Sequence, residues 1–404
     1  VQTCALPILY QKEFSAKILK TVEINGCTEV LLDQTAFYPE GGGQGADFGT
    51  VTLQEDGRSF SVTDVQEEEG EIWHFVSGTD DSAFGPGQKI CGAIDWERRF
   101  DHMQQHSGEH IVSGMICRRF QCDNVGFHLG ADIVTIDFNA RISMQEAEEI
   151  EAQANQYIWE DHPFEEFRPS EEERKTLAYR SKKELEGEVR ITRFPGADTC
   201  ACCGTHVLRS GQVGLVKFLS ARSFHGGTRL ELLCGKRALQ FLALNYHVNK
   251  AAAVLLSSDE EHTAEHVEKL LQEHLHLKTE IAAMGKRLLH QLARSCQEKG
   301  NVCLVDETLS PEQARPLADL IADCCNGMAA VFVREEDRYR YAIIQRNSEI
   351  SDFIREMNQA LEGRGGGRNG FAQGSVNASS GKIRAYFAAD PLKDTRPFWL
   401  ADGE

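Results

Sequence analysis

The stretch DWERRFDHMQQHSGEHIVSGMICRRF, residues 95–120, predicts a long helix that carries reactive side chains on one face. Its histidines His102, His106 and His110 are four residues apart, so all three lie on one side of the helix. Two imidazoles at positions i and i+4 are close enough to bind one cation. Ser107, and not a glutamate, follows His106, which excludes the His-Glu-x-x-His metalloproteases. A histidine pair alone is still weak support for a metal site.

A second group of metal-ligand residues lies about a hundred residues further on, in ADTCACCGTHV, residues 197–207. His206 can be paired with Cys202 or with Cys203, because both spacings suit metal binding and Gly204 bends the chain between them. Either pair would join the helix histidines in a site with three nitrogens and one sulfur. The alternative is a buried reduced patch beside an unrelated histidine. Ligand spacing in both halves favours one Zn²⁺ per chain.

A glycine-rich stretch, FYPEGGGQGADFG, occupies residues 37–49. Its glycines Gly41, Gly42 and Gly43 permit positive φ angles and close approach of the backbone to another group. Two interpretations are open, a tight connection in a β-barrel or a loop that lies against a ligand. The residues alone favour the connection.

A second glycine-rich stretch, GRGGGRNGFAQGS, occupies residues 363–375 and is predicted to be a loop. Arg364 and Arg368 flank three glycines, and Phe371 follows. Arginines can pair with phosphates, and a phenylalanine can stack on a base or ribose. The alternative is a turn that closes the C-terminal domain.

The pattern of elements predicts an α+β multidomain chain. Residues 9–93 alternate short β-type runs such as EVLLD, GTVTL and IWHFV with turn dipeptides, which indicates a small β-barrel. Ser143 and Glu146 have capping-box spacing and predict a helix start. The expected domains are an N-terminal β module with the glycine motif (1–93), a zinc-dependent α/β domain (94–235), a helical hairpin or coiled-coil connector (236–299) and a C-terminal α/β domain (300–404).

The composition disfavours three classes of protein: non-specific nucleic-acid binders, disulfide-rich proteins and membrane-spanning proteins. The net charge of −19 weighs against a non-specific nucleic-acid binder. The 13 cysteines are irregularly spaced, which favours a reduced, cytoplasmic location over a disulfide framework. No apolar run approaches ~18 residues, so we expect no membrane span.

Together the motifs resemble the free-standing alanyl-tRNA editing proteins, the long form of the AlaX family. Three motifs in order carry the resemblance: FYPEGGGQGADFG, the pair HSGEH with Cys202 to His206, and GRGGGRNGFAQGS, which is similar to the glycine-rich end of a DHHA1 domain. The match covers about residues 9–390. The family usually has C-G-G-T-H, and here Cys203 replaces the first glycine.

The resemblance implies a fold, a site and a reaction. Residues 94–235 would form an editing domain of the threonyl/alanyl-tRNA synthetase second-additional-domain type, and the C-terminal domain would be DHHA1-like. The reaction would be hydrolysis of the ester in Ser-tRNA(Ala), and also Gly-tRNA(Ala), in trans and without charging tRNA. The metal ligands carry over to His106, His110, Cys202 and His206.

Roles for further residues follow less directly. Glu109 is a candidate base or partner of a ligand, and Thr205 a candidate catalytic group that helps to select serine. Candidates for contact with the substrate near the metal are Gly41, Gly42, Gly43 and Gln44. Candidates for contact with tRNA(Ala) are Arg364 and Arg368. The synthetase segment Gln-x-Gly-Ser corresponds to Gly126–Gly130 here, so no catalytic glutamine is transferred.

Several alternatives stay open at this level. Zinc could activate water or position the substrate. The chain could also be a structural zinc protein that binds tRNA without hydrolysis, or a zinc hydrolase of small aminoacyl substrates. The leucine-rich helices near 260–295 predict a homodimer through the connector and the C-terminal domain.

Overall fold

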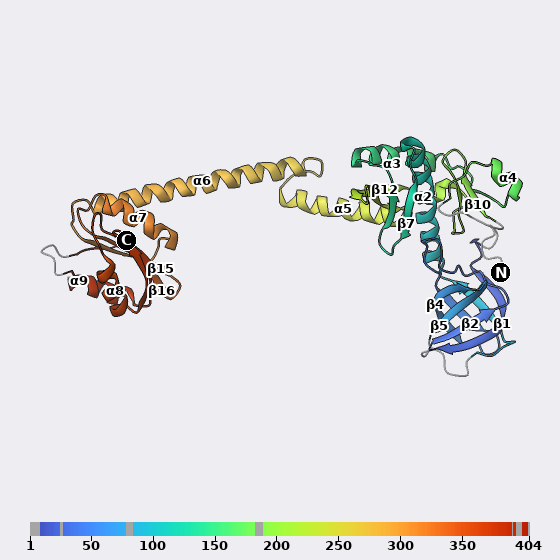
Figure 1. The fold of residues 1–404 in the computed structure, drawn as a ribbon, viewed down its shortest axis with the longest axis horizontal. Coiled ribbons are helices and arrows are strands. Elements are labelled where there is room, and N and C mark those ends of the chain that lie inside the picture. The colour runs from blue at the N-terminus through green and yellow to red at the C-terminus, as the bar shows by residue number, and fades with distance from the viewer. Residues whose placement is uncertain are drawn as a thin grey trace. The chain divides into compact units, whose positions relative to one another are not determined.

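The computed structural model describes residues 9–24, 27–77, 84–181, 189–389, 391–392 and 398–402. The chain forms two compact units, residues 1–252 and 253–404. Figure 1 shows the first unit in blue to yellow-green and the second in yellow to red. Within the described ranges, no helix has the length and apolar character that crossing a membrane requires.

The first unit begins with a closed β-barrel of strand order β1-β2-β5-β4-β3-β6, which confirms the predicted barrel. Apolar residues alternate along each strand and fill the interior, as Phe14, Ile18, Val51, Ile72 and Ile90 do. The strands are β1 (Glu13–Ile24), β2 (Cys27–Leu32), β3 (Gly49–Leu53), β4 (Ser59–Glu68), β5 (Glu71–Ser77) and β6 (Lys89–Ile94).

Helix α2 (Trp96–Phe120) follows the last barrel strand directly and is the predicted histidine helix. Asp95 caps its start by accepting a hydrogen bond from the Arg98 backbone N–H. Gln121 ends it in the left-handed conformation with φ 49°. Most of the helix is buried from Arg99 to Ile116, so its histidines lie inside the protein.

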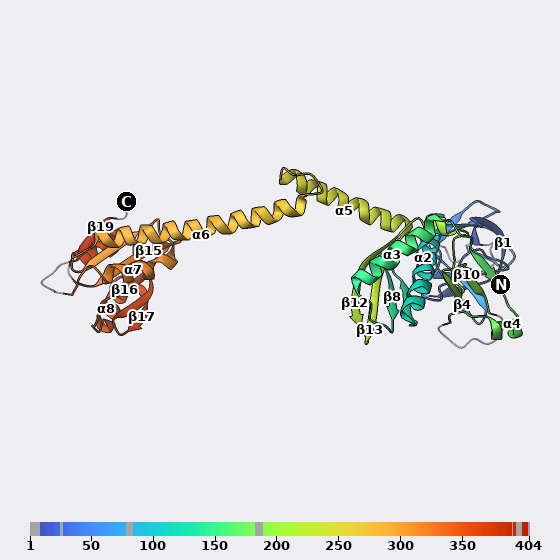
Figure 2. The same ribbon diagram turned by 90° about the horizontal axis from the view of Figure 1, so that it is seen from above.

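A four-stranded antiparallel sheet of order β12-β13-β8-β7 packs against α2 and α3. Figure 2 shows β12, β13 and β8 side by side beneath α3. The predicted capping box is present at the start of α3, where Ser143 and Glu146 bond each other's backbone N–H groups. A separate three-stranded sheet has the order β11-β10-β9.

These elements are β7 (Asn124–Leu129), β8 (Val134–Phe138), α3 (Met144–Trp159), β9 (Glu165–Phe167), α4 (Glu171–Thr176), β10 (Ile191–Phe194), β11 (Asp198–Ala201), the 3₁₀ helix η1 (Ser210–Val213), β12 (Val216–Phe224), β13 (Gly227–Cys234) and α5 (Gly235–Leu255).

The second unit contains a six-stranded mixed sheet of order β17-β18-β16-β15-β14-β19. Both faces of the sheet are covered, because β15 alternates between two cores: Phe332 packs with α8 and α9, and Val331 packs with α6 and α7. The elements are α6 (Thr263–Ser295), β14 (Val302–Asp306), the 3₁₀ helix η2 (Pro311–Gln313), α7 (Ala314–Ala322), β15 (Ala329–Glu335), β16 (Arg338–Ile344), α8 (Ser351–Ala360), β17 (Gly363–Arg368), β18 (Phe371–Val376), α9 (Ser380–Ala388) and β19 (Trp399–Asp402).

The second glycine-rich stretch forms an antiparallel hairpin of β17 and β18, so the prediction of a loop was wrong. Gly365 and Gly374 face each other across the two strands above Tyr341. A Cβ on Gly374 would lie 2.7 Å from the Tyr341 ring and 2.2 Å from the Arg364 carbonyl oxygen. Glycine is required here because the sheet packs too closely for any side chain.

Candidate metal centre

Four ligand-type side chains from two segments converge in the first unit. His106 and His110 come from α2, and Cys202 and His206 come from the segment that follows β11. One ligand atom from each lies within 4.8 Å of every other. The three histidines are almost fully buried. The structure therefore brings together the residues of both sequence motifs, with Cys202 and not the exposed Cys203.

Glycines on α2 allow the neighbouring elements to approach this helix closely. A Cβ on Gly114 would lie 2.2 Å from the carbonyl oxygen of Ala197, just before β11. A Cβ on Gly108 would lie 2.3 Å from the sulfur of Cys234 in β13. Since real Cβ atoms do not come so close, both positions need glycine for α2 to lie where it does.

Hydrogen bonds orient the two α2 histidines. Nδ1 of His106 lies 2.9 Å from Oε1 of Gln44, and Nδ1 of His110 lies 2.8 Å from Oδ2 of Asp198. Both oxygens can only accept, so each Nδ1 carries the proton. In the neutral form of each ring, Nε2 is then the atom with a lone pair for the centre, which is the tautomer that metal coordination needs.

Three buried nitrogens of the centre lack a hydrogen-bond partner among the described residues. Neither ring nitrogen of His206 nor Nε2 of His110 has a hydrogen bond within the described ranges, although all three atoms are buried. Unpaired buried polar atoms are costly and call for an explanation. A metal ion bound by these atoms would supply their missing partner.

The charge state of Cys202 also suits a metal. Burial raises the pKa of its thiol, but His106 and His206 outweigh burial and hold that pKa well below its usual range. Burial lowers the pKa of His206 well below its ordinary value, so this ring is neutral. One thiolate and three imidazoles in this arrangement fit tetrahedral Zn²⁺.

Glu109 lies at the edge of the centre. Its Oε2 is 3.9 Å from Nε2 of His110, and its Oε1 accepts hydrogen bonds from Ser113 and Asn124 at 2.7 and 2.6 Å. The carboxylate is buried and held by these two donors. It is placed to influence a group bound at the centre.

The first glycine loop lies over strand β7. The backbone N–H of Leu129 donates to the carbonyl oxygen of Gly43 at 2.9 Å. Gly43 has φ +87°, and a Cβ there would lie 2.7 Å from the Phe127 carbonyl oxygen. The Phe127 ring in turn stacks on His106 with 4.9 Å between ring centroids. The loop thus helps to enclose the centre on the side of β7.

Gln44 and Thr205 lie together inside the protein. Nε2 of Gln44 donates to the Thr205 hydroxyl at 2.9 Å, and the Thr205 backbone N–H donates to Oε1 of Gln44 at 3.1 Å. Both residues are fully buried. Gln44 therefore links the glycine loop by hydrogen bonds to His106 and to the Cys202–His206 segment. Gly41 forms a bridge with Gln44, while Gly42, with φ +62°, has open space beside it.

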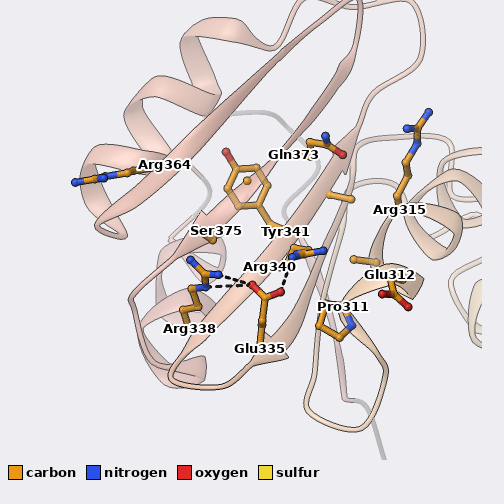
Figure 3. Close-up of a pocket in the computed structure, with 13 residues that line it drawn as sticks. Pro311, Glu312, Arg315, Glu335, Arg338, Arg340, Tyr341, Arg364, Gln373 and Ser375 are labelled. Carbon is orange, nitrogen blue, oxygen red and sulfur yellow. Dashed lines mark hydrogen bonds and ion pairs between the residues drawn. The ribbon is translucent and has the colours of Figure 1, made fainter. Parts of the chain in front are cut away.

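Arg364 lies in the second unit, in strand β17, and lines a pocket of about 490 Å³. Figure 3 shows Arg315, Arg338 and Arg340 around the same hollow. Arg338 and Arg340 both pair with Glu335, whereas the structure records no carboxylate partner for Arg315 or Arg364 among the described residues. Arg368 is exposed at the end of β17 and does not line this pocket.

Sequence reasoning missed Asp198, which contacts His110, and Arg180, which contacts Asp198. Asp198 lies four positions before Cys202, but a lone aspartate in a β-type run gives no signal of its own. Phe127 also escaped notice, because its stacking on His106 depends on tertiary structure.

Two family models match the barrel and the segment that contains Cys202 and His206. Residues 2–98 match the family model of class II (A) tRNA synthetases, and residues 189–231 match that of the threonyl and alanyl tRNA synthetase second additional domain. The second match contains Cys202 and His206.

Relatives are similar over nearly the whole chain. The alanine–tRNA ligase of Pyrococcus furiosus is 30% identical over 383 residues, which cover 91% of this chain and 41% of the ligase. The chain thus spans about two fifths of the ligases it matches. The alanyl-tRNA editing protein AlaX-L of Pyrococcus horikoshii is 26% identical over 390 residues, covering 93% of this chain and 94% of that protein.

A solved structure, the C-Ala domain of Aquifex aeolicus alanyl-tRNA synthetase, matches 23% of this chain and 90% of its own length at 24% identity and a TM-score of 0.20. The sequence similarity to AlaX-L extends over both chains almost completely. The predicted resemblance is thereby confirmed: this chain is similar over nearly its whole length to the long form of the alanyl-tRNA editing proteins and to the matching part of the alanine–tRNA ligases.

Proposed function

We propose that this chain is a trans-editing hydrolase that deacylates mischarged tRNA(Ala), with serine or glycine as the amino acid removed. The observation that carries the proposal is the buried centre of three histidines and Cys202, in a chain whose full-length relative is named for alanyl-tRNA editing. The match to the second additional domain of threonyl and alanyl tRNA synthetases supports it further.

The centre would hold one Zn²⁺ through His106, His110, Cys202 and His206. A bound zinc ion supplies a Lewis acid, which either polarises oxygen or fixes the substrate in place. The protein supplies the orientation of the ligands, because Gln44 and Asp198 fix two of the imidazole rings.

Glu109 is the side chain best placed to move a proton. Its Oε2 lies near Nε2 of His110, while Ser113 and Asn124 hold its other oxygen. A carboxylate held in this way can accept a proton from an attacking water and return it to the leaving ribose oxygen. Glu109 would therefore act as the general base for ester hydrolysis.

Selection of serine over alanine needs a polar group that pairs with the serine hydroxyl. Gln44 is a buried polar side chain that bonds His106, and Thr205 is a buried polar side chain that bonds Gln44. We assign them to this role together with the backbone of Gly41, Gly42 and Gly43, which lies in the same loop as Gln44.

A deacylation assay with Ser-tRNA(Ala), Gly-tRNA(Ala) and Ala-tRNA(Ala) tests the proposal. The parent protein should release serine or glycine, spare alanine, and neither consume ATP nor charge tRNA. Cys202→Ala should lose most of its zinc and activity, because it removes a ligand. Cys203→Ala is the matched control and should keep both, since this thiol is exposed and outside the centre.

Other outcomes would point to another function. Zinc and tRNA binding without release of any amino acid would indicate a structural zinc protein. Turnover of small aminoacyl esters with no activity on aminoacyl-tRNA would indicate a small-substrate hydrolase. Loss of zinc in Cys203→Ala with retention in Cys202→Ala would show that the ligand assignment is mistaken.

A further inference from the structure

Asp198 connects the candidate metal centre to Arg180, an arginine whose side chain is 22% exposed. Its Oδ2 accepts a hydrogen bond from Nδ1 of His110 at 2.8 Å. Arg180 donates to both oxygens of the same carboxylate, from Nε and Nη2, each at 2.7 Å. The Asp198 side chain is only 3% exposed. Arg180, Asp198 and His110 therefore form a continuous chain of charge-assisted hydrogen bonds.

The backbone holds this chain of residues in place. Asp198 begins β11 and pairs with Phe194 of β10. Arg180 is fixed on the other side of the strand, since its N–H donates to the Thr199 carbonyl at 2.8 Å and its carbonyl accepts from Ala201 N–H at 2.9 Å. Gly114 on α2 gives Asp198 room, because a Cβ there would lie 2.7 Å from the Asp198 Cβ.

The three imidazoles of the centre have different partners. His110 faces a carboxylate, His106 faces the neutral amide oxygen of Gln44, and His206 has no partner on either nitrogen within the described ranges. Only His110 is thus oriented by a charged group among the residues the structure describes. A carboxylate partner fixes the ring more strongly than an amide and makes its Nε2 a better donor.

We propose that Asp198, clamped by Arg180, is a positioning residue that presents Nε2 of His110 to the metal and raises the metal affinity of the centre. The inference rests on the proposed zinc site. It goes beyond the four ligands, because it states that Asp198, which does not bind the metal itself, increases the affinity for the metal. Arg180 contributes by preventing the Asp198 carboxylate from rotating away.

A second arrangement makes a competing prediction. His110, Asp198 and Cys200 also lie close enough to offer ligand atoms to one ion. If a metal bound there, Asp198 would be a ligand itself, and Cys200 would be needed as well. Cys200→Ser separates the two arrangements, because under our proposal it leaves metal affinity within about twofold of the parent.

The test measures zinc affinity of the full chain by competition with a chromophoric chelator, without tRNA. Asp198→Ala should bind zinc about 10- to 100-fold more weakly, the usual effect of losing such a partner. Asp198→Asn keeps a hydrogen-bond acceptor and should lose about tenfold or less. Asp137→Asn is the matched control, because Asp137 pairs with Arg229 at 2.7 and 2.8 Å in the same unit but contacts no ligand.

Replacement of zinc by cobalt(II) gives a second measurement, the absorption spectrum of the bound metal, which a general loss of stability would not change. The absorption of the cobalt-loaded protein should shift in Asp198→Ala and Asp198→Asn, because His110 is differently oriented, and should stay unchanged in Asp137→Asn. Zinc affinity within twofold of the parent in a folded Asp198→Ala, or a parent that binds no zinc, would overturn the proposal. A parent that binds zinc but does not deacylate tRNA would refute the proposed function alone.

Discussion

At the scale of single residues, Gly204 is the position with the least room in the candidate centre. A Cβ there would lie 2.1 Å from Cε1 and 2.4 Å from Nδ1 of His106, and 3.1 Å from Oε1 of Gln44. Gly204→Ala must therefore displace the His106 ring or break its bond to Gln44. Overpacking of this kind costs about 1–3 kcal/mol, so we expect zinc binding to weaken roughly ten- to a hundredfold.

Gly85→Ala is the control for this variant, because the nearest atom to a Cβ at Gly85 is 3.9 Å away. It should leave zinc content and affinity unchanged. Equal zinc affinity of Gly204→Ala and the parent, measured with the same chelator, would show that His106 is not held against Gly204 as described.

The sequence predicted the four ligand-type residues of this centre better than the residues that contact them. Spacing on a helix placed His106 and His110 together, because helical periodicity is local. Spacing alone left Cys202 and Cys203 open, and the structure distinguishes them by burial and position. Asp198 reaches His110 only through the pairing of β10 with β11, which no local pattern reveals.

At the scale of elements, the barrel strands, α2 and the capping box of α3 were predictable from alternation, periodicity and cap residues. Strand β17 was not, because three consecutive glycines carry no strand propensity. It forms because β18 offers a partner and because Tyr341 leaves no space for larger residues. The tertiary environment decides the conformation here.

Strand β5 contains a buried histidine that makes the barrel sensitive to acid. His74 donates from Nδ1 to the Val30 carbonyl oxygen at 3.0 Å, and its Nε2 accepts from the Thr35 hydroxyl at 2.8 Å. Burial lowers the pKa of His74 from 6.5 to about 4. Between these values the unfolded chain binds a proton that the folded chain does not.

The free energy of unfolding is therefore unaffected by His74 above pH 6.5 and falls as the pH drops toward 4. The loss amounts to about 3 kcal/mol over this window, at ~1.4 kcal/mol for each pKa unit. His74→Gln cannot titrate, so its stability should depend on pH less steeply by this amount. Urea denaturation of both proteins at pH 7 and pH 4.5 measures the difference.

His102 also has a lowered pKa, to about 3, because it is buried and lies near Arg98. It destabilises the folded parent and the His74→Gln variant alike in acid, so the comparison of the two isolates His74. If the free energy of unfolding of the two proteins depends on pH in the same way, His74 is protonated inside the barrel without loss of stability.

At the scale of the whole molecule, an acidic chain must bind an acidic partner if the proposed function holds. The net charge is −19, so contacts with tRNA depend on local clusters of basic residues. Arg315 and Arg364 of the second unit have no carboxylate partner among the described residues, and both line the pocket in Figure 3. Guanidinium groups without a carboxylate partner are suited to phosphate oxygens.

The exposed apolar residues of α6 include a set with the spacing typical of a coiled-coil seam, because successive members lie three, seven, four and three residues apart. They are Val267, Leu270, Leu277, Ile281 and Met284. A stripe of this kind is costly to leave in water. The homodimer expected from the sequence stays a prediction. A dimer would place two arginine pockets in one particle and would increase the positive surface available to one tRNA.

Replacement of Arg364 and Arg368 together by alanine tests whether the second unit contacts tRNA. Each lost phosphate contact lowers the slope of log affinity against log salt by ~0.7–0.9, so the double variant should bind more weakly and with a slope smaller by about 1.5. The single-turnover rate at saturating tRNA should stay near that of the parent, because neither arginine belongs to the metal centre.

The matched control removes two positive charges from the same unit at Arg334 and Arg346, which pair with Glu307, Asp319 and Asp323. Alanine at these positions should change affinity and salt slope little, because their charges are already neutralised locally. If the two double variants behave alike, the effect is one of net charge. If Arg364 and Arg368 can be removed without loss, the glycine-rich hairpin is structural, and the phosphates must be bound by other residues.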